Sequence, residues 1–146
     1  MNDPEVIHEM LDATADGNKR TIAVVGLSDN PDKPSYYVSE YMQRHGYKIL
    51  PVNPSIQTVL GEHSYPSLAA LPVKPDVVNV FRPPAAIPAI VDEMLALGLP
   101  NLWVQQGIVN LEAAQRAEQA GIHVVMDHCI MVEHRSLGIG KLQSKL

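Results

Sequence analysis

Short apolar runs alternate along this chain with segments in which apolar residues recur every three or four positions. The runs contain few polar residues, which is typical of parallel strands that are buried on both faces of a sheet. They predict strands at residues 21–27, 47–52, 76–81, 102–105 and 122–126.

The periodic segments between these runs predict helices. Asp3 or a neighbour is placed to cap the first helix, while Ser35 and Asn110 are placed to cap two later ones. The predicted helices cover residues 4–15, 35–44, 87–97 and 111–120, with single helical turns at 67–71 and 130–134 and a turn or very short edge strand at 61–66.

Strands separated by helices imply right-handed crossover connections and a parallel sheet. The sequence therefore predicts the α/β class. We expect one domain over residues 1–146, an open parallel sheet with helices on both faces, and an N-terminal helix at about 4–15.

Composition and charge argue against nucleic-acid-binding, secreted and membrane-spanning proteins. The chain has 146 residues and a net charge of -5, which argues against a nucleic-acid partner. A single cysteine, Cys129, precludes an internal disulfide and suits a reducing cytoplasm. We expect no signal peptide and no membrane span, because the apolar runs are short and the first residues lack a basic and apolar leader pattern.

The strongest functional signal is the stretch from the first strand into the second helix. The apolar run ends at Gly26-Leu27-Ser28, a polar loop containing Lys33 follows, and the helix begins near Ser35. A glycine lets a ligand approach the backbone, and a helix start offers unpaired N–H groups. This arrangement predicts a phosphate site.

The other strand ends also carry polar or conformationally special residues. They are Asn53-Pro54, Phe81-Arg82-Pro83, Gln105-Gln106-Gly107 and Asp127-His128-Cys129. Ligands of open parallel sheets bind beyond the carboxyl ends of the strands, so we expect these residues to share one site.

Two common nucleotide motifs are absent from this stretch. A nicotinamide dinucleotide site needs three glycines and an acid after the second strand, whereas this chain has Gly26 alone and Asn53 in place of the acid. No Gly-Lys-Ser/Thr follows the strand, which excludes a Walker loop. We therefore predict another nucleotide-like ligand, with its phosphate near Ser28 and with Arg82 and Lys33 as sources of positive charge.

Between residues 19 and 137 the chain resembles the small, single-domain CoA-binding proteins, which are related to the CoA-binding domain of the succinyl-CoA synthetase α subunit. The blocks that carry the resemblance are Val24-Val-Gly-Leu-Ser28, Ser35-Tyr36, Gly46-Tyr47, Ile49-Leu-Pro-Val-Asn-Pro54, Gly61 with Tyr65-Pro-Ser-Leu68, residues 77–82 and Val125-Met-Asp-His-Cys129.

The resemblance implies a Rossmann-like fold and coenzyme A as the ligand. Gly26 and Ser28 would meet the diphosphate, residues 53–54 would border the adenosine, and residues 81–84 would form a wall along the pantetheine. Members of the family often have arginine where this chain has His128. In the synthetases, catalysis needs further domains, so the resemblance implies no ligase activity for this chain alone.

Cys129 invites two interpretations. The spacing of Asp127, His128, Cys129 and His134 fits no usual zinc pattern, so we predict no metal site. We hypothesise instead that Cys129 lies near the thiol of CoA and can form a mixed disulfide with it.

The sequence thus predicts a cytoplasmic protein that binds coenzyme A or an acyl-CoA at the strand ends without catalysing a reaction by itself. The alternatives are a small NAD(P)-using or acyl-CoA-processing enzyme, and a regulatory subunit that docks on a synthetase-like partner; a homo-oligomer is left open. The predicted cofactor-binding residues are Gly26, Leu27, Ser28, Lys33, Ser35, Tyr36, Asn53, Pro54, Phe81, Arg82, Pro83, Gln106 and Cys129.

Overall fold

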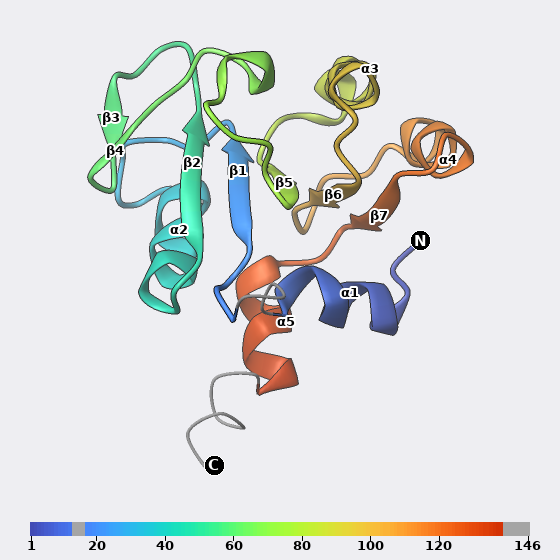
Figure 1. The fold of residues 1–146 in the computed structure, drawn as a ribbon, viewed down its shortest axis with the longest axis horizontal. Helices are drawn as coiled ribbons and strands as arrows, with labels where there is room; N and C mark the ends of the chain where they lie inside the picture. The colour runs from blue at the N-terminus through green and yellow to red at the C-terminus, as the bar shows by residue number, and fades with distance from the viewer. Residues whose placement is uncertain (13–16, 139–146) are drawn as a thin grey trace.

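The computed structural model describes residues 1–12 and 17–138 and contains one main sheet (Figure 1). Its five parallel strands are β1 (Thr21–Val25), β2 (Lys48–Val52), β5 (Val77–Val80), β6 (Asn101–Val104) and β7 (His123–Met126), in the order β2-β1-β5-β6-β7. Strand β2 lies on one side of β1, and β5, which follows β2 in the main sheet along the chain, lies on the other side of β1. The strand order therefore reverses between β1 and β5, which is where such sheets bind ligands.

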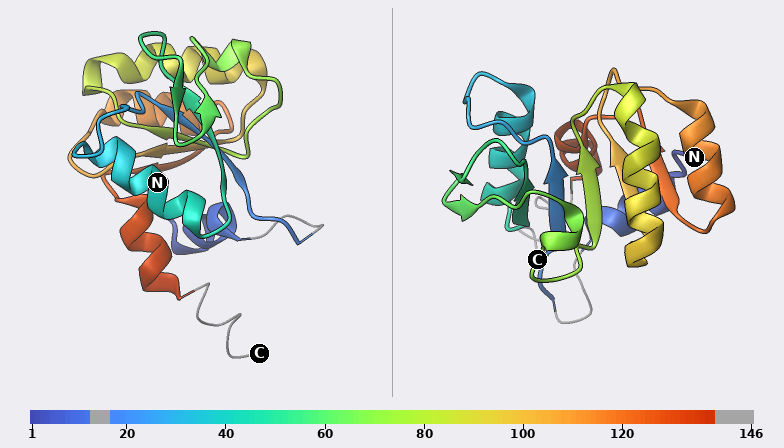
Figure 2. Two further views of the ribbon diagram at one scale, coloured as in Figure 1. Left: turned by 90° about the vertical axis from the view of Figure 1, so that its left-hand side faces the viewer. Right: turned by 90° about the horizontal axis from the view of Figure 1, so that it is seen from above.

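Helices cover both faces of this sheet. They are α1 (Pro4–Leu11), α2 (Pro34–Arg44), α3 (Ile87–Leu97), α4 (Leu111–Gln119) and α5 (Ile130–Leu137), and two short 3-10 turns occur at Leu68–Ala70 and Pro84–Ala86. The left view of Figure 2 shows α3 and α4 above the sheet and α1, α2 and α5 below it. The predicted α/β class and Rossmann-like parallel sheet are confirmed.

Each face of the sheet has its own apolar core, because successive side chains of a strand point to opposite faces. In β1, Ala23 packs in the core beneath α3 and α4, whereas Ile22 and Val24 pack in the core beneath α1, α2 and α5. Trp103 of β6 belongs to the second core, is fully buried, and donates a 2.9 Å hydrogen bond from Nε1 to the backbone oxygen of His128. Burial on both faces explains why the strands read as unbroken apolar runs.

Two segments differ from the sequence prediction, and a third, at 61–66, contains a very short strand, which was one of the two predicted alternatives. The segment 130–134, expected to form a single turn, lies in the helix α5, which extends to Leu137. The turn around 61–66 belongs to a small antiparallel hairpin of β3 (Thr58–Val59) and β4 (Glu62–His63). Helix α1 ends at Leu11, and most of the predicted extension to residue 15 lies outside the described residues.

Candidate functional site

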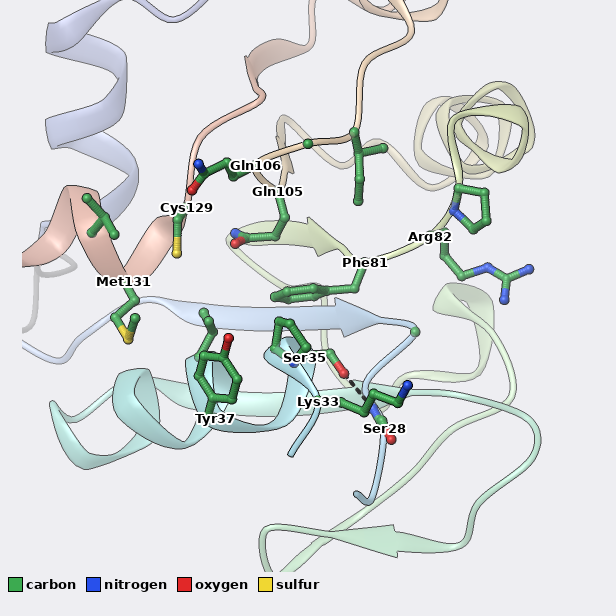
Figure 3. Close-up of a pocket in the computed structure, with 17 residues that line it drawn as sticks. Ser28, Lys33, Ser35, Tyr37, Phe81, Arg82, Gln105, Gln106, Cys129 and Met131 are labelled. Carbon is green, nitrogen blue, oxygen red and sulfur yellow. Dashed lines mark hydrogen bonds between the residues drawn. The ribbon is translucent and has the colours of Figure 1, made fainter. Parts of the chain in front are cut away.

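A pocket of about 870 Å³ opens at the carboxyl ends of β1, β5 and β6, between the first turns of α2 and α5 (Figure 3). Its volume is in the range of small-molecule sites. The described residues that line it are Gly26, Ser28, Lys33, Pro34, Ser35, Tyr37, Val38, Phe81, Arg82, Pro83, Gln105, Gln106, Gly107, Ile108, Cys129, Met131 and Val132.

Gly26 allows the loop after β1 to lie directly against the end of β5. Its φ is +88°, in the left-handed region that L side chains rarely adopt. A Cβ atom on this residue would lie only 2.6 Å from the backbone oxygen of Phe81. Only glycine satisfies both conditions, so the close approach of these two strand ends depends on this residue.

The side chain of Ser35 holds the loop between β1 and α2. Ser35 Oγ accepts a 2.9 Å hydrogen bond from the backbone N–H of Ser28, and Ser28 Oγ accepts one of 3.0 Å from the N–H of Asn30. The prediction that Ser35 caps the helix is wrong: α2 begins at Pro34, with Lys33 at the N-cap position and no side-chain cap. Proline suits the first helical position because its missing N–H has no partner to bond there. The uncapped, positive end of α2 thus borders the pocket.

Positive charge gathers on the same side of the pocket. Lys33 and Arg82 are exposed, line the pocket, and form no ion pair within residues 1–12 and 17–138. No aspartate or glutamate is among the described lining residues. In a chain with a net charge of -5, this side of the pocket is therefore locally positive.

A buried pair of amides forms part of the pocket wall. Gln105 Nε2 donates a 2.8 Å hydrogen bond to Oδ1 of Asn79, a residue in the middle of β5 that is only 1% exposed. Figure 3 shows the Gln105 side chain projecting between Phe81 and Cys129. Because its N–H group is engaged with Asn79, its carbonyl oxygen is the group that a ligand N–H can use. The signal for this pair was a polar asparagine inside an otherwise apolar strand.

The remaining side of the pocket comes from the segment between β7 and α5. The backbone oxygen of His128 accepts the hydrogen bond from Trp103, and His128 Nδ1 lies 2.8 Å from a carboxylate oxygen of Glu133. Asp127 Oδ1 accepts a 2.7 Å hydrogen bond from the N–H of Gly107, which joins this segment to the loop after β6. These contacts set the position of Cys129, which is partly buried and lines the pocket.

A buried histidine joins the two helices whose first turns border the pocket. His134 of α5 is only 3% exposed, and its Nδ1 lies 2.8 Å from the hydroxyl of Tyr41 in α2. Burial, and secondarily the electrostatic interactions with His45 and Lys19, lower the pKa of His134 to about 4. Burial also raises the pKa of Tyr41, so the tyrosine hydroxyl donates to a neutral imidazole at neutral pH.

Four of the predicted residues do not line this pocket. Leu27 is fully buried in the core, and Tyr36 packs partly buried against the same core. Asn53 donates a 3.0 Å hydrogen bond from Nδ2 to the Leu27 oxygen and accepts one from the N–H of Ser55, and Pro54 is exposed beside it. Asn53 therefore has a structural role in this loop, and its contact with adenosine stays a prediction.

The other nine predicted residues line the pocket together: Gly26, Ser28, Lys33, Ser35, Phe81, Arg82, Pro83, Gln106 and Cys129. The list of predicted cofactor-binding residues lacked eight further lining residues, namely Pro34, Tyr37, Val38, Gln105, Gly107, Ile108, Met131 and Val132, although Gln105 and Gly107 belong to a strand end that was expected to contribute to the site. Several of these are apolar residues of helix first turns, which have no distinctive sequence signal because they resemble ordinary core positions.

Within residues 1–12 and 17–138, no three histidine, cysteine, aspartate or glutamate side chains gather as a metal site requires. None of the described helices has the length and apolar character needed to cross a bilayer.

Residues 20–135 match the family model described as a CoA binding domain. The chain is 47% identical over 115 residues to the uncharacterized protein YneT of Bacillus subtilis, a match that covers 79% of this chain and 85% of that one. The solved structure of a hypothetical protein from Pyrococcus horikoshii OT3 is 36% identical, with a TM-score of 0.83 over 92% of each chain.

The chain also resembles part of a larger enzyme. It is 26% identical over 101 residues to acetate–CoA ligase [ADP-forming] II of Archaeoglobus fulgidus. This match covers 68% of the chain but only 15% of the ligase.

Proposed function

The chain belongs to the CoA-binding domain family, and on this basis we propose that it binds coenzyme A or an acyl-CoA in the pocket at the carboxyl ends of β1 and β5. One observation supports this choice of binding site. The two unpaired cations, Lys33 and Arg82, lie with the uncapped start of α2 at the point where the strand order reverses. An anionic nucleotide needs these elements at this position.

The diphosphate of CoA is proposed to lie against the loop at Gly26 and Ser28. There it would meet the positive end of α2 and the side chains of Lys33 and Arg82. The planar guanidinium of Arg82 suits two phosphate oxygens at once. The adenosine would extend out of the pocket toward exposed Pro54.

The pantetheine arm is proposed to run along Phe81 and Pro83 toward Cys129. Its amide N–H groups need acceptors in a partly buried wall, and the Gln105 carbonyl is available for this purpose. The thiol or thioester would then lie at the α5 side of the pocket. We propose binding without catalysis by this chain alone.

A comparison of ligands tests this proposal. Thermal unfolding is measured with CoA, NAD, NADP and ATP at equal concentrations, and titration calorimetry follows for those that stabilise the protein. A ligand that binds only the folded state raises the Tm, so CoA is expected to give the largest increase. A rise with NAD or NADP and none with CoA would refute the proposal and support the oxidoreductase alternative.

Native mass spectrometry of the purified protein tests whether Cys129 forms a mixed disulfide. The Cys129 thiolate would attack CoA disulfide, form the Cys129–CoA disulfide and release one CoA thiolate. The expected product is a CoA adduct that disappears on reduction and is absent from Cys129→Ser. An unmodified Cys129 after incubation with CoA disulfide would remove this hypothesis.

The match to part of the ligase favours a second candidate function. In that relative a similar domain occupies a small share of a longer chain, so this chain could act as a subunit that docks on a synthetase-like partner. Affinity capture from lysate with and without CoA tests it. A partner of this class should appear reproducibly, and its amount should change with CoA.

A further inference from the structure

The pocket is electrostatically divided along its length. Figure 3 shows Ser28, Lys33 and Arg82 on one side of Phe81, and Tyr37, Met131 and Cys129 on the other. We call the second region the acyl end and define it as Tyr37, Val38, Cys129, Met131 and Val132. All five residues line the pocket, and none of them is a lysine, arginine, histidine, aspartate or glutamate.

Two titratable side chains just before α5 have partners within the described residues. On the segment that leads into α5, His128 Nδ1 lies 2.8 Å from Glu133 Oε1, and Asp127 accepts the hydrogen bond from the Gly107 N–H. The positively charged residues that line the pocket, within the described part of the chain, are Lys33 and Arg82 at the opposite end. A carboxylate placed at the acyl end would therefore lose hydration without gaining a partner among the cations that line the pocket.

From this division we infer that the pocket prefers acyl-CoA thioesters whose acyl group is uncharged, and disfavours those whose acyl group ends in a carboxylate. The inference rests on the proposed function, because the anionic half of CoA must first occupy the cationic end. With that half in place, the thioester lies at the acyl end, where apolar side chains favour methylene groups.

The exposure of the acyl end limits how many carbon atoms of an acyl chain add to the affinity. Val38 at its base is 3% exposed, whereas Tyr37 and Val132 at its mouth are each 45% exposed. The first carbons of an acyl chain would lose contact with water, and later ones would emerge past the mouth. We therefore expect affinity to rise from CoA to butyryl-CoA and then to level off.

Titration calorimetry with butyryl-CoA and succinyl-CoA tests the inference, because their acyl groups contain the same number of carbon atoms and differ in the terminal carboxylate. A fully buried methylene contributes about fourfold in affinity. Partial exposure reduces this, so butyryl-CoA should bind roughly three- to tenfold tighter than succinyl-CoA. Free CoA and octanoyl-CoA complete the series, and octanoyl-CoA should bind about as tightly as butyryl-CoA.

The variant Val132→Lys places a cation at the mouth of the acyl end and should reduce the preference for butyryl-CoA. Val73→Lys is the matched control, because Val73 is 55% exposed and is not among the residues that line the pocket. Any general attraction of the added charge for the phosphates acts on both thioesters and cancels in their affinity ratio. The ratio should change by severalfold in Val132→Lys and stay unchanged in Val73→Lys.

The outcomes separate the two proposals. If CoA binds but butyryl-CoA and succinyl-CoA bind equally well, or if both lysine variants change the ratio alike, the acyl inference is wrong and the CoA site stands. If CoA and its thioesters all fail to bind, the proposed function is wrong and the inference falls with it.

Discussion

Replacing Gly26 by alanine tests how the pocket is built. The substitution is destabilising for two independent reasons. Its φ of +88° is strained for any L side chain, and the new Cβ would lie 2.6 Å from the Phe81 backbone oxygen. Because that contact is with backbone, the loop after β1 and the end of β5 must move apart.

The magnitude follows from the two terms. A non-glycine residue in the left-handed region costs about 1–2 kcal/mol. Separating two packed backbone segments adds a comparable amount, so we expect Gly26→Ala to lower the free energy of unfolding by about 3 kcal/mol. For a chain near this size, that corresponds to a fall in Tm on the order of 10 °C.

Gly107→Ala is the matched control. Gly107 lines the same pocket and has a φ of +86°, but a Cβ atom there would meet nothing within 4 Å. This variant should show the conformational cost alone, about 1–2 kcal/mol.

Urea unfolding followed by circular dichroism measures both variants, and calorimetry then measures CoA binding to the folded protein. Gly26→Ala should lose more stability and more CoA affinity than Gly107→Ala. Equal losses of stability would show that the contact with Phe81 does not constrain the strand ends, and the reasoning would fail.

The remaining predictions concern charge, the loop and pH. Arg82→Ala should weaken CoA binding roughly 10- to 100-fold with little change in stability, because a hydrogen bond to a charged group contributes about 1.5–3 kcal/mol. Arg135→Ala is the control, because Arg135 is exposed and lies outside the pocket lining. Equal losses of affinity in both variants would contradict the assignment of Arg82 to the site. Ser35→Ala removes the hydrogen bond that closes the loop and should cost about 1 kcal/mol of stability and severalfold in affinity. Ser39→Ala should cost less, because the buried Ser39 hydroxyl has no hydrogen-bond partner among residues 1–12 and 17–138. Equal effects of the two substitutions in urea unfolding and calorimetry would contradict this. His134 has its pKa lowered to about 4, so the unfolded state binds the extra proton between the ordinary pKa of 6.5 and 4. The contribution of His134 to the free energy of unfolding should therefore be complete above pH 6.5 and should fall by on the order of 2 kcal/mol as the pH drops to 4, after allowance for solvent screening. Urea titrations should show that His134→Gln reduces this pH dependence. An unchanged slope of unfolding free energy against pH would exclude His134 as its source.

Part of the candidate site could be predicted because its signals are local. Gly26 and Ser28 follow an apolar run, and Phe81 and Arg82 precede prolines, so each marks a strand end by its neighbours alone. The carboxyl ends of parallel strands share one edge of the sheet, and these residues accordingly meet at the pocket.

The residues that were missed or misassigned depend on contacts between distant segments. Serine is a common helix N-cap residue, but the Ser35 hydroxyl accepts a hydrogen bond from the Ser28 N–H, seven residues earlier. Asn53 has a second role that its local sequence did not indicate, because its amide donates to the Leu27 oxygen across neighbouring strand ends; its contact with adenosine stays a prediction. Nothing in the local sequence indicates which of several available donors and acceptors a side chain will meet.

The sequence by itself determined the class of fold and the line of strand ends at which a ligand should bind, because burial and periodicity act over a few residues at a time. The tertiary structure decided the shape and polarity of the pocket. Sheet order brings Gly26 within reach of Phe81, and the packing of α2 beside α5 sets Tyr37 and Met131 at the opposite end from Lys33 and Arg82. Such a division between cationic and apolar ends arises only when elements far apart in the chain pack together, since no single segment contains both.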